Sequence, residues 1–310
     1  MFLVPKTICA ADVMQTRLTT VGPAVHFSHA VAMLVRRAVS GLPIVEADGT
    51  YLGMFSEKCC LRIVQDCPAL RDDTEGTPPL LASDAMATRL LLLHEEDDVF
   101  DGIEQLLSHR VSGAPVLNRN EQFVGIFSEK TSVSVLIQSV FENLPSTQIG
   151  PFVNRDRGRI VEETTPLSKI VETFVKTDFR RLPVLRGGHV VGQVSRRDVI
   201  KHPKINRWIG HLSDHPHPNR ARDVDYNVLA FADTTANTIG PDLDLLSILG
   251  LFLSTPYRRL PVLENGRLVG QISRRDVLQK VIDETKQVPA EPHGTSLYLS
   301  ALGGEFPSFG

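Results

Sequence analysis

The chain is poor in several features that mark whole classes of protein. It has four cysteines and one tryptophan among 310 residues, and no apolar run approaches the roughly 18 residues needed to span a bilayer. Cys9, Cys59, Cys60 and Cys67 follow no metal-ligand spacing, and the N-terminus lacks the basic start and long apolar core of a signal peptide. We therefore expect a soluble, cytoplasmic protein with reduced thiols and no membrane contact.

Motifs for catalysis and for common cofactors are missing as well. No G-x-G-x-x-G, P-loop, H-E-x-x-H or nucleophile elbow occurs in the sequence. One stretch contains four possible metal ligands, His211, Asp214, His215 and His217. Prolines interrupt this stretch, which favours residues without a metal-binding role over a metal site. A net charge of −3 argues against a general polyanion binder. We expect neither an enzyme nor a metal site nor a nucleic-acid partner.

An internal repeat dominates what the chain does contain. Residues 180–199 read RRLPVLRGGHVVGQVSRRDV and residues 258–277 read RRLPVLENGRLVGQISRRDV, with 15 of 20 positions identical. The same hairpin begins at Ser40 (SGLPIVEADGTYLGMFSEK) and at Ser112 (SGAPVLNRNEQFVGIFSEK). The copies are spaced by about seventy residues, which is the size of a small βαββα element and too long for a solenoid repeat.

Each copy predicts the same succession of elements. Apolar residues recur at helical spacing before each hairpin proline. The helices that this spacing predicts cover residues 28–39, 98–111, 166–178 and 242–254. Thr165 and Pro166 have N-cap and N1 character, so the third of these helices should begin there. Two short apolar strands joined by a turn follow, and a second helix begins after the serine that ends the second strand.

A single unit of this kind cannot bury the apolar face of its own sheet. Pairing the first unit with the second and the third with the fourth would bury these faces and create two equivalent clefts in each pair. Polar, proline-bearing linkers at 67–83 and 201–222 support this pairing. We predict one module at residues 8–143, a second at residues 148–284, and a flexible tail at residues 285–310.

The order of leading helix, R-L-P-V, two strands and G-x-x-S-x-x-D resembles the CBS (cystathionine β-synthase) domain. The resemblance covers nearly the whole chain as four copies, or two Bateman modules, an arrangement similar to that of the γ subunits of AMP-activated protein kinase. It implies an α+β fold of four βαββα repeats without catalysis of their own. It also implies that the chain binds AMP, ADP, ATP or a related adenosine ligand, and that it regulates a partner protein. The modules would close into a disk, within one chain or in a homodimer.

The chemistry of the third and fourth repeats suits such a ligand. Asp198 and Asp276 each follow a serine by three residues at a helix start, and a carboxylate that accepts two hydrogen bonds suits the hydroxyls of a ribose. Serine hydroxyls, N–H groups at a helix N-terminus and arginine forks suit phosphate oxygens. By resemblance to the family, the phosphate ligands or their immediate neighbours are Arg180, Arg181, Ser195, Arg197, Arg258, Arg259, Ser273 and Arg275.

The loop before the third leading helix resembles the family's segment that faces the base and the sugar. Thr164 or Thr165 would take that role in the third repeat. The corresponding stretch of the fourth repeat, FADTTANTIGPDLDLL, reads as longer, so its equivalent residue stays open between Thr238 and Asp242.

The first two repeats lack these groups. Cys59 and Thr131 replace the aspartates, serine-glycine pairs replace the leading arginines, and Glu57 and Glu129 stand where Arg196 and its counterpart would be. A glutamate would repel a phosphate, so we expect the first module to be a scaffold, a dimer surface or a partner surface. Lys58 and Lys130 leave open that it binds a different anion.

A second interpretation of the Ser-x-x-Asp motif competes with ligand binding. An aspartate three residues after a serine is also an ordinary helix cap, and exposed arginines are usually solvated. The alternative function is therefore a structural assembly module with no physiological ligand. The repetition of both arginine pairs and the aspartate in two copies favours the ligand.

Overall fold

The computed structural model describes residues 8–66, 80–140, 148–211, 227–235 and 237–287. The fold is α+β, and the four predicted repeats are present. The first repeat contains α1 (Ala10–Val13), α2 (Phe27–Arg36), β1 (Gly41–Val45), β2 (Tyr51–Ser56) and α3 (Glu57–Asp66). The second contains α4 (Ala82–Ala85), β3 (Leu93–His94), α5 (Val99–Ser108), β4 (Gly113–Leu117), β5 (Phe123–Ser128) and α6 (Glu129–Val140).

The third and fourth repeats follow the same order. The third contains the short 3₁₀ turns η3 (Gly150–Phe152) and η4 (Arg157–Arg159), then β6 (Val161–Glu162), α7 (Leu167–Lys176), β7 (Arg181–Arg186), β8 (His189–Ser195), α8 (Arg196–Lys201) and α9 (Pro203–His211). The fourth contains η5 (Val228–Ala230), α10 (Leu245–Ser254), β9 (Arg259–Glu264), β10 (Arg267–Ser273) and α11 (Arg274–Gln287). The helix and hairpin predictions are thereby confirmed, with small shifts at the ends.

Two boundaries differ from the sequence prediction. Helix α7 begins at Leu167 with Pro166 as its N-cap, one residue later than predicted, because Thr165 Oγ1 is used in a turn, where it accepts a hydrogen bond from the backbone N–H of Glu162 at 3.0 Å. Helix α11 continues to Gln287, so residues 285–287 are helical and do not belong to a flexible tail. The rest of that predicted tail lies outside the described residues.

Strand pairing joins the third repeat to the fourth. Hairpins β7–β8 and β9–β10 form one five-stranded sheet in the order β6-β7-β8-β10-β9, linked where His189 pairs with Arg267. In the first two repeats the hairpins β1–β2 and β4–β5 are bridged at their tips by Thr50 and Gln122. Sheets therefore associate between repeats one and two and between repeats three and four.

Helix packing joins the repeats in the other combination. Helix α3 packs against α7 and α8, and α6 packs against α10 and α11. One hydrophobic core accordingly spans the first and third repeats, with Phe27, Phe55 and Phe174 fully buried. The other spans the second and fourth, with Phe127 and Phe252 fully buried. The sheets hold each pair of repeats together, and the helices hold the two pairs together.

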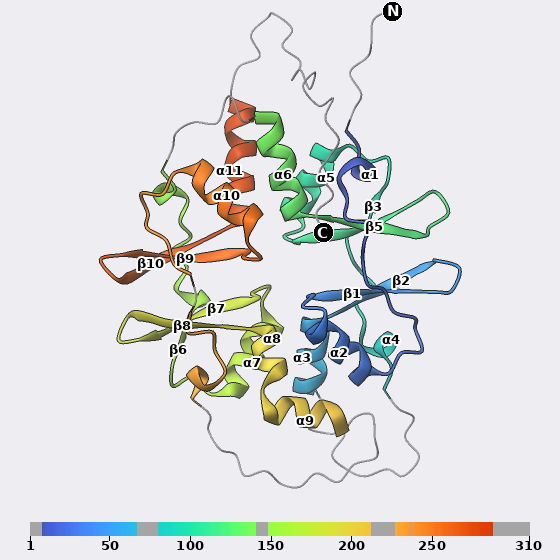
Figure 1. Cartoon of the computed structure of the whole chain (residues 1–310), viewed down its shortest axis with the longest axis horizontal. Coiled ribbons are helices and arrows are strands. Elements are labelled where there is room, and N and C mark those ends of the chain that lie inside the picture. Colours follow the sequence, from blue (N-terminus) through green and yellow to red (C-terminus); the bar gives the residue numbers. More distant parts are fainter. Residues whose placement is uncertain (1–7, 67–79, 141–147, 212–226, 236, 288–310) are drawn as a thin grey trace, which may run out of the picture.

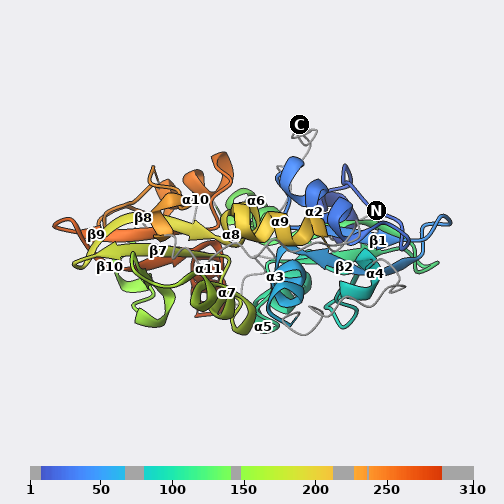
Figure 2. The same cartoon turned by 90° about the horizontal axis from the view of Figure 1, so that it is seen from below.

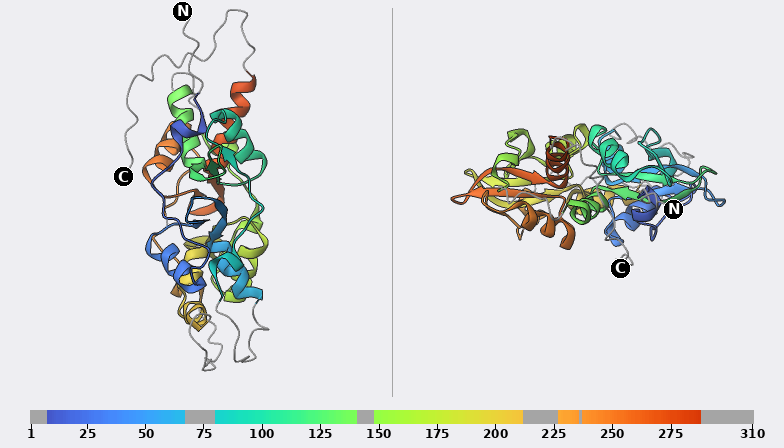
Figure 3. Two further views of the ribbon diagram at one scale, coloured as in Figure 1. Left: turned by 90° about the vertical axis from the view of Figure 1, so that its right-hand side faces the viewer. Right: turned by 90° about the horizontal axis from the view of Figure 1, so that it is seen from above.

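The result is a flat disk with the four repeats arranged around its centre (Figure 1). Strands β6–β10 lie on one side of this view and β1–β5 on the other, with the two helix groups above and below (Figure 1). The edge-on views show how thin the molecule is (Figures 2 and 3). The four repeats close this disk within one chain, which was one of the two arrangements that the family resemblance implied.

The glycine of each G-x-x-S motif allows the chain to cross over the sheet. A Cβ at Gly270 would lie 2.5 Å from the carbonyl oxygen of Asn154, and a Cβ at Gly192 would lie 3.0 Å from that of Asp233. At these points the segment before one repeat pairs with the second strand of the other, Asn154 with Gln271 and Asp233 with Gln193. The two crossing segments, around Asn154 and around Asp233, thus place residues of each repeat beside the second strand of the other.

Candidate functional site

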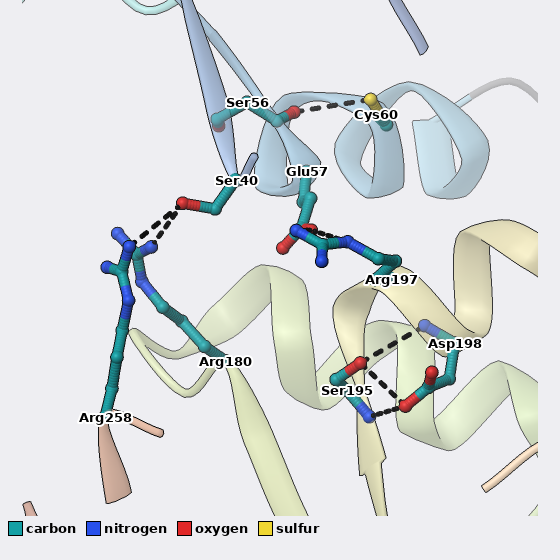
Figure 4. A network of polar contacts seen from close by, with 9 residues as sticks. All are labelled: Ser40, Ser56, Glu57, Cys60, Arg180, Ser195, Arg197, Asp198 and Arg258. Atoms are coloured by element: carbon teal, nitrogen blue, oxygen red, sulfur yellow. Dashed lines mark hydrogen bonds and ion pairs between the residues drawn. The ribbon is translucent and has the colours of Figure 1, made fainter. Parts of the chain in front are cut away.

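Two equivalent polar centres lie where β8 and β10 lead into α8 and α11. The N–H and Oγ of Ser195 donate to Asp198 Oδ2 at 2.8 and 2.6 Å, and the N–H of Asp198 donates to Ser195 Oγ at 3.2 Å (Figure 4). Ser273 and Asp276 repeat this capping box at 2.7, 2.6 and 3.3 Å. In the described part of the chain no hydrogen bond uses Oδ1 of either aspartate. Each carboxylate thus caps a helix with one oxygen and keeps the other available.

The arginine that directly follows each serine has a structural role. Arg196 Nη2 donates to the carbonyls of Phe174 and Thr177 at 3.1 and 2.9 Å, and so completes the C-terminus of α7. Arg274 does the same for α10, through the carbonyls of Phe252 and Thr255. Both arginines are buried. They stabilise the repeat rather than face a ligand.

Arg180 and Arg258 face the first module across the centre of the disk. Arg180 Nη1 donates to Ser40 Oγ at 2.9 Å, and Arg258 donates to Ser40 Oγ at 3.4 Å (Figure 4). Arg258 also donates to Ser112 Oγ at 2.9 Å. Burial, and then the neighbouring charge of Arg258, lower the pKa of Arg180 to about 9, so this guanidinium stays protonated at neutral pH. A serine hydroxyl satisfies a donor without cancelling its charge. The centre of the disk therefore has two guanidinium groups that these hydroxyls leave cationic.

Arg197 and Arg275 form ion pairs with the first module. Arg197 lies 3.0 Å from Glu57 and Arg275 lies 3.3 Å from Glu129 (Figure 4 shows the first pair). The glutamate side chains are only 8% and 7% exposed, whereas the arginine side chains are 27% and 28% exposed. The sequence argument that these glutamates would repel a phosphate left out their arginine partners, which neutralise them. A phosphate at Arg197 or Arg275 would have to compete with a carboxylate.

Arg181 and Arg259 line a crevice between the two central hairpins that is too narrow to hold a water molecule. Its walls come from the two central hairpins of the second module, namely Arg181, Pro183, Gln193, Arg259, Pro261 and Gln271. Arg181 Nη1 lies 3.4 Å from Gln193 Oε1 and 3.8 Å from Asp233 Oδ2. Nη1 of Arg259 is buried and has no hydrogen-bond partner among the described residues. Burial lowers the pKa of Arg259 to about 10 against the opposing charge of Asp276.

Several residues near these centres were missed by the sequence analysis. The Arg159 guanidinium lies 4.6 Å from the centre of the Phe179 ring, and that of Arg181 lies 5.7 Å from the Tyr257 ring. Gln271 Nε2 donates to the carbonyl of Arg159 at 2.8 Å. The sequence held a signal for the aromatic pair, because DFRRLPV and PYRRLPV each place an aromatic residue before the arginines. It held none for Arg159, which only the crossing segment brings here.

The fourth repeat has a direct counterpart of the base-facing loop. Ile239 pairs in parallel with Val262 as Val161 pairs with Val184, and α7 and α10 have the same length and the same offset from these bridges. Asp242 therefore corresponds to Thr164. The prediction that this loop is longer in the fourth repeat is wrong from Ile239 onward, where the two repeats match residue for residue.

The first module keeps the cap but not the carboxylates. The hydroxyl of Ser56 donates to Cys59 Sγ at 3.2 Å, and Ser128 Oγ lies 3.0 Å from Thr131 Oγ1. Cys59 and Cys60 are buried free thiols, and burial raises the pKa of Cys60 well above that of an exposed thiol. The same backbone geometry thus occurs in all four repeats, while the second oxygen of a carboxylate occurs in two.

The described residues show neither a metal cluster nor a membrane span. No group of three or more histidine, cysteine or acidic side chains is placed to hold a metal ion in that part of the chain. Asp214, His215, His217 and Cys67 lie outside the described residues. Trp208 of α9 packs against the core shared by the first and third repeats. No helix among the described residues is long and apolar enough to cross a membrane.

Comparison with known proteins supports the fourfold repeat. The CBS domain family model matches residues 10–66, 82–131, 155–204 and 228–283. An uncharacterised protein of Methanocaldococcus jannaschii is 28% identical over 198 residues, which cover 63% of this chain and 67% of that protein. An A-adding tRNA nucleotidyltransferase of Aquifex aeolicus is 31% identical over 122 residues, but these cover 39% of this chain and only 14% of that enzyme.

The crystal structure of the same Methanocaldococcus jannaschii protein has a similar fold. It superimposes with a TM-score of 0.74 and 18% sequence identity, covering 88% of this chain and 99% of that one. That protein is described as a candidate archaeal homologue of the AMP-activated protein kinase γ subunit. With four matching segments that make up most of its length, this chain belongs to the CBS-domain family and carries four CBS domains in one polypeptide.

Proposed function

We propose that the chain is a regulatory sensor that binds an adenosine-containing ligand, AMP, ADP, ATP or a relative, in the module of residues 148–284. Asp198 and Asp276 would bind ribose hydroxyls through their available oxygens, and Thr164 would lie beside the base and sugar. The phosphates would meet the guanidinium groups and serines of both repeats, namely Arg180, Arg181, Ser195, Arg197, Arg258, Arg259, Ser273 and Arg275. CBS domains are regulatory modules, so we propose no reaction, and the cytoplasm stays the predicted location.

One observation carries this proposal. Arg180 and Arg258 converge on the centre of the disk with only serine hydroxyls as partners. Two adjacent guanidinium groups that no carboxylate neutralises are unfavourable unless an anion joins them. The nearest acidic side chains, Glu57 and Glu129, are already paired with Arg197 and Arg275. The four arginines at this interface thus carry two more positive charges than their two glutamate partners neutralise, which favours binding of a phosphate.

The same contacts suggest how ligand binding would change the interaction with a partner protein. Arg197 and Arg275 cross from the second module to Glu57 and Glu129 of the first. A phosphate that attracts these arginines would weaken two of the contacts that hold the modules together. A ligand shifts an equilibrium only through a difference in affinity between its states, and exchange of a carboxylate for a phosphate supplies that difference. The first module, residues 8–143, would then be the scaffold or partner surface.

A structural assembly module without a ligand is the second candidate. It is favoured by the finding that both aspartates cap helices and that four of the six arginines named above contact the first module. If these arginines and aspartates serve only to close the disk, their structural contacts are enough to explain their presence. This candidate predicts that their substitution weakens the disk and changes no binding.

Calorimetry and thermal unfolding with adenosine, AMP, ADP and ATP decide between the candidates. A ligand present at about 100 times its Kd should raise the free energy of unfolding by about 2.7 kcal/mol. We expect at least one of the four to do so, and expect the effect to be lost in the Asp198→Ala/Asp276→Ala double variant. The absence of any shift would favour the assembly module. Binding that survives in the double variant would refute the assignment of the aspartates.

A further inference from the structure

The two centres of the second module are built to one plan from both repeats. The first contains Asp198, Gln193 and Arg181 of the third repeat together with Tyr257 of the fourth. The second contains the corresponding residues of the fourth repeat with Phe179 of the third, namely Asp276, Gln271, Arg259 and Phe179. We refer to them as the Asp198 centre and the Asp276 centre.

The crossing segments add different charges to this plan. At the Asp198 centre, Asp233 pairs through its backbone with Gln193 and places its carboxylate 3.8 Å from Arg181. At the Asp276 centre, Asn154 pairs with Gln271 in the same way, and the segment then continues to Arg159. One crossing segment thus brings a carboxylate beside the leading arginine, and the other brings a guanidinium together with its own ion-pair partner Asp156. Neither Asp233 nor Arg159 belongs to the repeated motif.

Three contacts hold Arg159 at the Asp276 centre, two of them through its guanidinium. Its guanidinium lies 4.6 Å from the middle of the Phe179 ring, its backbone carbonyl accepts from Gln271 Nε2 at 2.8 Å, and its Nε lies 3.3 Å from Asp156 Oδ2. The side chain of Asp156 is 52% exposed while that of Arg159 is 23% exposed, so solvent screens the aspartate more than the arginine. The positive charge of Arg159 is therefore only partly cancelled.

The leading arginines of the two centres differ as a consequence. Arg181 is oriented toward Asp233 and Gln193. Among the described residues no ion pair joins Arg259 to a carboxylate of its crossing segment, where Asp156 pairs with Arg159 instead, and the buried Nη1 of Arg259 has no hydrogen-bond partner there. The Asp276 centre thus offers a guanidinium whose donors are not all used, beside a second guanidinium. At the Asp198 centre a carboxylate lies 3.8 Å from the leading guanidinium and partly offsets its charge.

We infer that Arg159 and Asp233 make the two centres specific for ligands of different charge. The Asp276 centre takes the more highly phosphorylated adenosine ligand, and the Asp198 centre takes one with fewer phosphates or none. This inference rests on the proposed function and adds the ligand class of each centre. One elementary charge more or less at this depth changes the affinity for an anion by about tenfold.

Chains with one intact centre test this difference by calorimetry. Asp198→Ala leaves the Asp276 centre and Asp276→Ala leaves the Asp198 centre, with the matching Asp→Asn variants as substitutes if a capping loss prevents folding. The ratio of the adenosine Kd to the ADP Kd should be at least about tenfold larger at the Asp276 centre. Arg159→Gln in the first chain should reduce that ratio by about five- to tenfold, and Asp233→Asn in the second should raise it by a similar factor.

Matched controls carry the same change of charge outside the centres. Arg155→Gln alters an exposed arginine of the same crossing segment, and Glu264→Gln alters an exposed carboxylate at the end of β9. Both should leave the ratio unchanged within about twofold, since a distant exposed charge is screened. Equal ratios in the two single-centre chains, or equal effects of Arg155→Gln and Arg159→Gln, would overturn the inference alone. An unsubstituted chain that binds none of adenosine, AMP, ADP and ATP would overturn the proposed function and the inference with it.

Discussion

Arg197 of α8 lies 3.0 Å from Glu57 of α3, and the contact crosses from the second module to the first. The glutamate is almost fully buried at the N-terminus of its helix, while about a quarter of the arginine side chain reaches solvent. Arg275 and Glu129 repeat the arrangement in the other pair of facing repeats. These ion pairs stabilise the disk and occupy two of the arginines that a phosphate would need.

Replacing Glu57 with glutamine should separate these two roles. Arg197 would lose its ionic partner and become available to a phosphate, so the affinity for ADP should rise by about three- to tenfold. The free energy of unfolding should fall by about 1–3 kcal/mol, less than for a fully buried pair because Arg197 is partly solvated. Calorimetry gives the first quantity and urea unfolding the second.

The ion pair between Glu96 and Arg119 provides the control for this experiment. It has a contact of 2.6 Å but lies on the surface, with side chains 53% and 81% exposed. Glu96→Gln should leave both the ADP affinity and the unfolding midpoint within experimental error. A loss of ADP affinity in Glu57→Gln would contradict the competition between carboxylate and phosphate.

Substitution of Arg180 should weaken the binding of phosphate groups and leave the binding of the nucleoside unchanged. Replacement by glutamine removes one of the two guanidinium groups at the centre of the disk but keeps a donor for Ser40. The affinity for ADP should fall by about tenfold, and the affinity for adenosine should not change. Arg186→Gln is the control, because Arg186 is exposed and already paired with Glu163 at 2.6 Å. Equal losses for ADP and adenosine would show that Arg180 supports the fold rather than binds phosphate.

The fold could be predicted from the sequence because the repeat contains each helix and hairpin in four copies that can be compared. Hairpin proline, G-x-x-S glycine and serine recur in every copy, and the structure gives the glycine its reason. Gly192 and Gly270 lie directly beneath a crossing backbone, where a side chain would collide. A residue required by backbone geometry is kept wherever that geometry recurs, which makes it visible without a structure.

The site was only partly predictable, for a physical reason. The repeated motif identified Asp198, Asp276 and the arginines, but it could not show that Arg197 and Arg275 face glutamates of the other module. These partners are some 140 residues apart in sequence, and helix packing between modules brings them together. Arg159 and Asp233 were missed because they lie in the crossing segments, which differ between the repeats. Functional residues that occur in only one repeat cannot be found by comparing the repeats with one another.

The crossing at Gly270 gives a prediction about stability. A Cβ there would lie 2.4 Å from Val153 Cγ1 and 2.5 Å from the Asn154 carbonyl oxygen, so Gly270→Ala should displace the crossing segment and lower the free energy of unfolding by about 1–3 kcal/mol. Gly250→Ala is the matched control, since Gly250 lies within α10 with nothing within 4 Å of its Cβ position. That change should stabilise the chain by about 0.5–1 kcal/mol. Urea unfolding measures both, and a Gly270→Ala variant as stable as the parent chain would show that the segment does not cross here.

His202 gives a prediction about pH. Its side chain is buried between α8 and α9, 2% exposed, with its ring centre 5.0 Å from that of Phe231. Burial, and then the charge of Lys204, lower the pKa of His202 below the ordinary value of 6.5. A neutral imidazole is thus favoured in the folded chain, so its contribution to stability is complete above about pH 6.5 and is lost as the pH falls toward the lower, folded-state pKa.

The free energy of unfolding should therefore fall more steeply between about pH 7.5 and pH 5 in the parent chain than in His202→Asn. Asparagine cannot be protonated in this range, yet its side-chain oxygen can accept the backbone N–H of Lys204 that His202 Nδ1 accepts at 3.3 Å. His189→Asn, at an exposed position on the β8 hairpin, should keep the steep dependence of the parent chain. Parallel pH profiles for the parent chain and His202→Asn would show that this histidine is not the titrating group.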